Sequence, residues 1–201
     1  MKAYKKEEKK MLKTIDVGLM ANHLSAHKGV ISRLELYTKH AKEQQLVVIL
    51  QKQIGIMKNH VEVMNQLLNP NQNNNLNLPP IPQNVPMYQN QSNQLDIGID
   101  DRDMALDAHF TATAMANDNF ISATNMKDPQ VKKIHAEMAL QQSDIANLHE
   151  NFAHQQGWLT HPNATNIQQN EAINPLGKFQ PNPTVMNIQS NLSTQNQNRI
   201  N

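Results

Sequence analysis

The sequence predicts an all-α protein, a four-helix bundle made of two antiparallel hairpins. Four segments repeat apolar residues at steps of three and four, which is the spacing of one face of a helix. Strands are not evident anywhere in the chain. Two stretches rich in Asn and Gln lie between and after these segments, so that about 120 residues remain for one compact helical domain.

The first hairpin is expected over residues 14–69. Its first helix runs from about Asp16 to Lys42 and its second from about Glu43 to Asn69. Pro70 ends the second helix, because proline cannot continue one. The apolar face consists of Met20, Leu24, Ile31, Leu34 and Ala41 in the first helix, and of Leu46, Leu50, Ile54, Met57, Val61, Met64 and Leu68 in the second.

The second hairpin is expected over residues 100–160, starting at the helix-capping pair Asp100-Asp101. Asp128 and Pro129 fit the N-cap and first residue of its second helix, and Gly157 fits its end. The face of that helix is Ile134, Met138, Ile145, Leu148 and Phe152. The face of the preceding helix is small, which predicts close approach of a neighbour: Ala105, Ala112, Ala116 and Ala123, with Phe120 as its one large member.

The remaining segments are predicted to lack a core of their own. Residues 1–13 form a basic arm with six Lys and two Glu, read as a solvated end or as an arm for an anionic partner. The linker 70–99 and the tail 161–201 are predicted to be disordered, since 13 of the 25 residues 70–94 and 16 of the 39 residues 163–201 are Asn or Gln. The linker is long enough to span a bundle, which favours the single long crossover of ferritin-like folds.

The two hairpins also show a weak internal repeat. A shift of 82 positions places Leu24 and His27 on Leu106 and His109, and a shift of 89 places His60 on His149. The matches are few, so both duplication and chance resemblance stay open.

Four histidines are the candidate site residues, since each helix carries one at or beside its apolar face: His27, His60, His109 and His149. Two facing imidazole pairs could bind Zn, Fe or Mn. A carboxylate-bridged di-metal site, however, needs Glu three positions before the histidine, where this chain has Met57 and Ala146. We therefore expect buried histidines that hydrogen-bond across the bundle, to Gln53, Asp107 or Gln142, with a mononuclear metal site as the alternative.

Several function classes are not expected. The net charge of +1 argues against a nucleic-acid binder, and the lack of Cys excludes thiol chemistry. No apolar run suits a signal peptide or a membrane span, so the protein is expected to be made in the cytoplasm and soluble. No phosphate-binding loop and no nucleophile–base set can be assembled. The prediction is a protein without enzymatic activity or cofactor.

The second hairpin resembles the Coat F family of spore coat proteins from endospore-forming Bacilli. The resemblance covers residues 100–158 and rests on D-R-D-M-A-L-D (Asp101–Asp107) and L-H-E-N-F-A-H-Q-Q-G-W (Leu148–Trp158). The chain departs from the family at Phe110 and Thr111, where the family often has a Lys. The resemblance implies a ferritin-like fold without iron chemistry and a structural role in the spore coat, with other coat proteins as partners. The amide groups of the Asn/Gln-rich segments are suited to self-association through polar ladders. The alternatives are a bundle that stores or buffers a divalent metal, and a helical adaptor.

Overall fold

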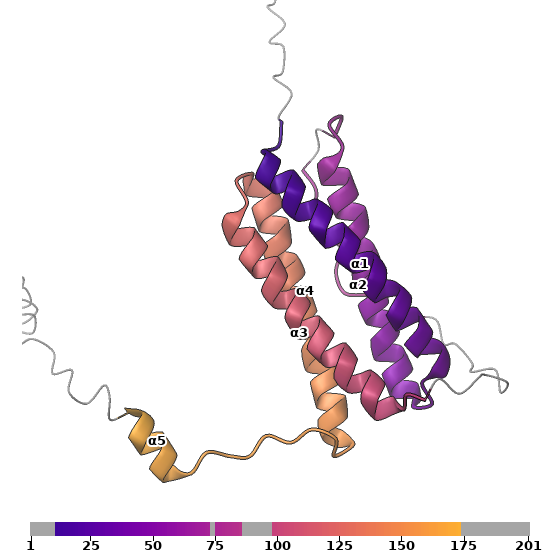
Figure 1. The fold of residues 1–201 in the computed structure, drawn as a ribbon, viewed down its shortest axis with the longest axis vertical. Coiled ribbons are helices and arrows are strands. Elements are labelled where there is room, and N and C mark those ends of the chain that lie inside the picture. Colours follow the sequence, from indigo (N-terminus) through magenta and orange to yellow (C-terminus); the bar gives the residue numbers. More distant parts are fainter. Residues whose placement is uncertain (1–10, 73–74, 86–97, 174–201) are drawn as a thin grey trace, which may run out of the picture. The chain divides into compact units, whose positions relative to one another are not determined.

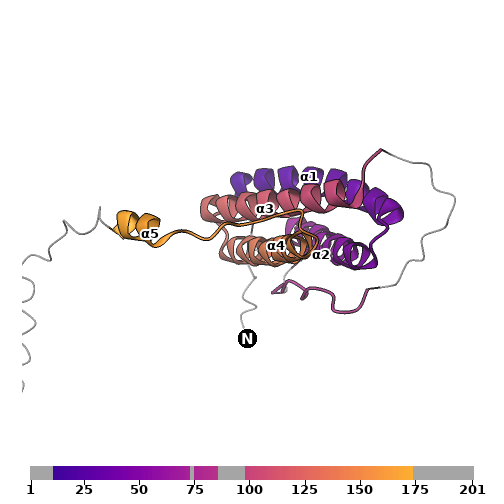
Figure 2. The same cartoon turned by 90° about the horizontal axis from the view of Figure 1, so that it is seen from below.

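The structure, a computed structural model, describes residues 11–72, 75–85 and 98–173 (Figure 1). These residues contain helices and no strand, as the sequence predicted. The bundle consists of α1 (Thr14–His40), α2 (Gln44–Leu68), α3 (Asp101–Asn125) and α4 (Pro129–Gln155). Seen from below, α1 and α3 form one layer and α2 and α4 the other (Figure 2). No helix in these ranges is both long enough and apolar enough to cross a bilayer.

A separate unit begins at His161 and contains α5 (Asn166–Ile173), which buries no residue. The helix lies in the tail that was predicted to be disordered. Its start is fixed by a reciprocal cap, since Gln168 N donates to Thr165 Oγ1 and Thr165 N donates to Gln168 Oε1. The disorder predicted for 73–74, 86–97 and 174–201 lies outside the described residues, as does the first part of the basic arm, 1–10.

The predicted ends of the second hairpin are found where the capping residues stand. Asp100 accepts a hydrogen bond from Asp103 N, and Asp128 accepts from the first backbone N–H groups of α4. Beyond α4, Gly157 takes a positive φ of 72°. This left-handed residue lets Trp158 N donate back to Ala153 O at 2.9 Å, which closes the helix end.

Two aspartates join the hairpins reciprocally. Asp16, buried near the start of α1, accepts from Lys127 N at 2.6 Å and Asp128 N at 3.2 Å in the α3–α4 connection. Asp101, at the start of α3, accepts from Lys42 N at 3.0 Å and Glu43 N at 2.6 Å in the α1–α2 connection. Each hairpin therefore holds the turn of the other.

These contacts reveal an internal repeat with a shift of 85 positions, rather than the 82 or 89 suggested by matching identical residues. The shift places Asp16 on Asp101 and the bonded turn residues on one another. It also carries buried positions of α1 onto buried positions of α3: Met20, His23, His27, Leu34, Tyr37 and Thr38 onto Ala105, Ala108, Ala112, Asn119, Ser122 and Ala123. The pattern of burial, rather than residue identity, carries the repeat.

The crossover joins opposite ends of the bundle, as predicted, because α2 ends at one end and α3 begins beside the α1–α2 connection at the other (Figure 1). Its described part, 75–85, is more ordered than its composition predicted. Leu76, Leu78 and Ile81 pack against the bundle, and Gln141 Nε2 donates to Pro79 O at 2.7 Å. Gln130 Nε2 also donates to Leu76 O at 3.5 Å. A few apolar side chains and two hydrogen bonds to backbone carbonyls thus hold a Pro-rich segment along α2 and α4.

The core divides into two apolar clusters, one toward each end of the bundle. The larger contains Leu34, Leu50, Met57, Met104 and Phe152, and the smaller contains Met20, Met64, Met126, Ile134 and Met138. The prediction for the inner face of α3 was partly wrong. Ala105, Ala112 and Ala123 are buried and Ala116 is half-buried, but Phe120 is 59% exposed, and the large inner residues of α3 are Met104 and Met115.

Candidate functional site: a buried histidine layer

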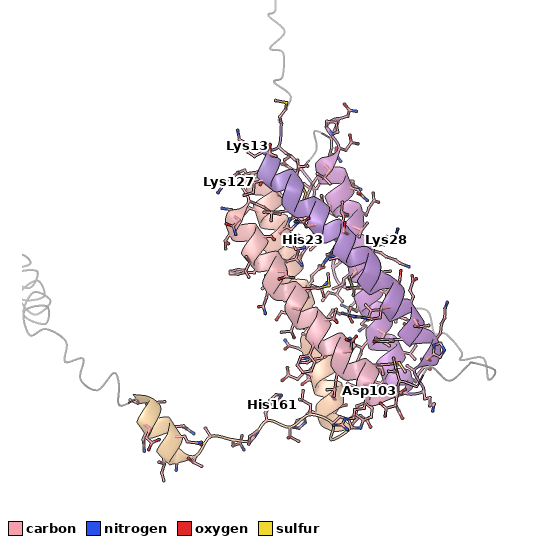
Figure 3. The ribbon with its side chains drawn as sticks, viewed as in Figure 1. Lys13, His23, Lys28, Asp103, Lys127 and His161 are labelled. Atoms are coloured by element: carbon pink, nitrogen blue, oxygen red, sulfur yellow. The ribbon has the colours of Figure 1, made fainter. Side chains whose placement is uncertain are left out.

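Four buried histidines lie between the two apolar clusters. His23 and His27 come from α1, His60 from α2 and His135 from α4. The ring centroids of His27 and His60 are 5.6 Å apart, and those of His23 and His135 are 5.4 Å apart. Figure 3 shows His23 between the two hairpins, whereas Lys28, one turn on, projects outward. The layer is therefore part of the interior.

Backbone carbonyls fix which ring nitrogens carry protons. His27 Nδ1 must donate to His23 O, 2.7 Å away, and His135 Nδ1 must donate to Val131 O, 3.0 Å away, because a carbonyl oxygen only accepts. In the neutral ring the other nitrogen, Nε2, is then an acceptor. For His135 this buried Nε2 has no hydrogen-bond partner among the described residues.

His60 is oriented from the crossover segment. Gln141 donates its amide Nε2–H to Pro79 O, so its Oε1 accepts from His60 Nε2–H at 3.0 Å. The remaining nitrogen of His60, Nδ1, lies 3.4 Å from His27 Nε2. Both of these nitrogens present lone pairs in the neutral rings, an arrangement that a shared proton or a cation would stabilise.

Burial keeps these rings neutral near pH 7. Desolvation lowers the pKa of His27 and of His135 to about 4 and that of His60 to about 3, and it also lowers the pKa of His23. The neighbouring histidines lower the pKa values of His27, His60 and His135 further, because two imidazolium charges would repel. The layer is consequently neutral and polar.

The predicted site residues are brought together only in part. His27 and His60 meet across the first hairpin. His149 is buried in the larger apolar cluster, where its Nε2 lies 2.9 Å from Gln53 Oε1, one of the partners proposed from the sequence. His109 is half-buried on the outer side, where its Nδ1 donates to Ala146 O at 3.1 Å, so it does not form a facing pair with His149.

Asp107 and Gln142, which were also proposed as hydrogen-bond partners of the histidines, have different contacts. Asp107 forms an ion pair with Arg33, 3.3 Å from its Nε. Gln142 is buried beside the histidine layer, and no hydrogen bond of its side-chain amide is found in the described ranges.

Sequence reasoning did not include His23 and His135 among the site residues. A signal was present for His23, since its spacing of four from His27 puts both rings on one helix face. For His135, the signal was its spacing of three and four from Met138 and Val131, both of them buried. In the described part of the chain, no group of three or more His, Asp or Glu side chains is arranged to hold a metal ion.

Comparison with known proteins gives one informative match. No family model matches the chain, and no curated protein matches it. Among solved structures, the crystal structure of BH2358 from Bacillus halodurans C-125, named a "putative spore coat protein", matches with a TM-score of 0.62. The match covers 78% of this chain and 96% of that chain, at 16% sequence identity. The chain thus shares the helical fold of BH2358.

Proposed function

We propose that the protein is a non-enzymatic structural component of the bacterial spore coat, where it assembles with other coat proteins. The observation that carries the proposal is the fold shared with BH2358, which extends over nearly the whole of that chain. The resemblance of residues 100–158 to the Coat F family points to the same role, and membership of that family is part of the proposal.

The interior supports a scaffold rather than a reaction centre. Three hydrogen bonds join polar side chains across the interior: His23 with Ser122, His60 with Gln141 and His149 with Gln53. Each of these bonds joins two different helices, so the groups hold the bundle together. The motifs that carry the family resemblance have structural roles too, since Asp101 joins the hairpins and Gly157 closes α4.

Localisation tests this proposal. A full-length fusion to a fluorescent protein should form a ring around the developing spore and remain with the coat fraction after spores are purified. The fluorescent protein alone, expressed from the same promoter, should stay diffuse. A fusion that remains diffuse in the mother cell and is absent from the coat fraction would refute the coat role.

A second candidate function is metal binding by the bundle, without di-iron oxidase activity. One observation favours this function: His27 Nε2 and His60 Nδ1, which both carry a lone pair in the neutral rings, lie 3.4 Å from each other. Their separation suits two ligands of one Zn²⁺ ion, whose Zn–N distances are about 2 Å. Two nitrogens are fewer than the three or four protein ligands that zinc sites use, which favours the structural reading.

Metal analysis of the purified protein separates the two candidates. We expect less than stoichiometric Zn, Fe or Mn in the wild-type protein after incubation with each metal. One equivalent of metal that is lost in His27→Gln but kept in His109→Gln would favour the metal-binding function. His109 is a suitable control because its ring lies outside the layer.

A further inference from the structure

One contact in the buried histidine layer lacks a proton. A continuous chain of polar contacts runs through the side chains of His27, His60 and Gln141. Both ends of this chain are backbone carbonyl oxygens, which only accept hydrogen bonds. Its four distances are 2.7 Å from His23 O to His27 Nδ1, 3.4 Å from His27 Nε2 to His60 Nδ1, 3.0 Å from His60 Nε2 to Gln141 Oε1, and 2.7 Å from Gln141 Nε2 to Pro79 O.

The chain has four contacts but only three protons with which to fill them. Each neutral imidazole carries one N–H, and the amide of Gln141 contributes one through Nε2. Turning that amide over would give His60 an N–H but would set the amide oxygen against Pro79 O, so the shortage would only move. The contact left without a proton is the one between His27 Nε2 and His60 Nδ1, where two lone pairs meet.

These two lone pairs point at each other almost head-on. The ring centroids of His27 and His60 are 5.6 Å apart, which is close to the 3.4 Å between the two nitrogens plus the radii of the two rings. The nitrogens and the ring centres therefore lie nearly on one line. Both residues are fully buried, so two nitrogen donors face each other from opposite sides inside the bundle.

This geometry matches the coordination preference of one kind of ion. Monovalent copper, a soft ion with a filled d shell, takes two imidazole nitrogens on a straight line, whereas zinc uses three or four protein ligands. Metal–nitrogen bonds of about 2 Å place the two nitrogens about 4 Å apart, so the rings need to part by roughly half an ångström. The pair is too small a ligand set for zinc and a complete one for Cu(I).

The surroundings of the pair suit a single positive charge. Burial lowers the pKa of His27 to about 4 and that of His60 to about 3, so no proton has to leave either ring before a metal binds near pH 7. Met57 and Met64 lie one turn before and one turn after His60 on the buried face of α2, and thioethers favour soft ions. In the described part of the chain neither ring is hydrogen-bonded to a carboxylate, so a divalent ion would bury an uncompensated double charge.

We propose that His27 Nε2 and His60 Nδ1 bind one Cu(I) ion on the line between them. Gln141 is a positioning residue of this site, because its bond to Pro79 O holds His60 in the tautomer that keeps Nδ1 free of a proton. Binding leaves the oxidation state of the ion unchanged. The inference goes beyond the coat role and does not rest on it. It also differs from the divalent-metal function considered above, both in the ion and in the number of ligands that the ion needs.

Anaerobic titration of the full-length, untagged protein with Cu(I), in competition with a colorimetric Cu(I) chelator, tests the proposal. The wild-type protein should bind one equivalent, and its X-ray absorption edge should show the strong pre-edge peak of two-coordinate Cu(I). His27→Gln and His60→Gln should each weaken binding by more than about 100-fold, beyond what the loss of an outer-shell partner costs. His149→Gln is the matched control, because His149 is equally buried and lies outside the pair, and it should leave the affinity unchanged. Circular dichroism checks that the variants fold.

Gln141→Ala tests the tautomer argument. Without the amide, His60 can donate Nδ1–H to His27 Nε2, so the affinity for Cu(I) should fall about tenfold although no ligand is removed. NMR of the ring nitrogens in the copper-free proteins should show His60 protonated at Nε2 in the wild type and at Nδ1 in the variant. An affinity that Gln141→Ala leaves unchanged would overturn the positioning role.

Two results would overturn the site itself. The first is less than one equivalent of Cu(I) in the wild-type protein, or an equal affinity of the wild-type protein and His27→Gln. The second is NMR evidence of a proton shared by the two rings at pH 7, because the proton would then fill the contact in place of the metal.

Discussion

The buried histidines should make the bundle lose stability in mild acid, as the pH falls below about 6.5. His135 and His149 are the clearest cases. In each ring one nitrogen is hydrogen-bonded, and the other is buried without a hydrogen-bond partner in the described ranges. Protonation in the native state would bury both a charge and an unpaired N–H, so desolvation lowers the pKa of His135 to about 4 and that of His149 to about 3.

The sign and size of the effect follow from linkage. The unfolded chain binds protons at these rings below its pKa of about 6.5, whereas the native state binds them only near 4 and 3. The free energy of unfolding is therefore fully present above about pH 6.5 and falls as the pH drops toward 4. At pH 5 each of these two rings lowers the free energy of unfolding by about 2 kcal/mol relative to its value above pH 6.5.

The total approaches the stability of the protein. His27 and His60 shift in the same direction, which brings the loss at pH 5 to between about 4 and 8 kcal/mol. Asp118 and Asp16 raise the pKa values of His23 and His135 slightly, but desolvation outweighs them. The total free energy of unfolding of a native domain is about 5–15 kcal/mol.

Urea unfolding monitored by circular dichroism between pH 7.5 and 4.5 measures this loss. His149→Gln has a neutral side chain at all these pH values, so it should lower the number of protons taken up on unfolding by about one. His154→Gln, at the exposed end of α4, should leave that number unchanged. A wild-type protein whose free energy of unfolding at pH 5 is within about 1 kcal/mol of that at pH 7 would refute the reasoning.

Three further outcomes are expected. Asp16→Ala removes the acceptor of two inter-hairpin N–H donors and should lower the free energy of unfolding by about 3 kcal/mol in urea titrations; a loss below about 1 kcal/mol would mean that the reciprocal contact contributes little. Gly157→Ala should lower the free energy of unfolding by about 1 kcal/mol, because φ is 72° at this position and alanine disfavours a positive φ. An unchanged melting temperature would contradict this. Gln141→Ala loses the bond to Pro79 O, so limited proteolysis should cut residues 75–85 several-fold faster than in the wild-type protein; equal rates would show that this bond contributes little to holding the segment.

Much of the fold was predictable because its signals are local. The apolar spacing, the caps at Asp100 and Asp128 and the stop at Gly157 each depend on a few neighbouring residues. The bond between His149 and Gln53 was also among the expected partners, since both residues fall on inner faces of their helices.

The errors arose where a long-range contact decides the outcome. Phe120 was placed inside because it is apolar, but the inner position is taken by Asn119, whose amide donates to Met115 O within the helix. Residues 75–85 were judged by composition alone, which cannot show the surface of α2 and α4 against which they pack. The role of Asp16 depends on a turn 111 residues away, and no local pattern marks it.

The reciprocal aspartates mean that neither hairpin is complete without the other. Asp16 satisfies backbone donors at residues 127 and 128, and Asp101 does the same at 42 and 43. A chain cut within the crossover should therefore yield two fragments that recognise each other by the same pair of contacts. In this view the crossover is a tether that raises the effective concentration of one half around the other. The present protein is then equivalent to a dimer of hairpins whose two subunits have been joined in one chain.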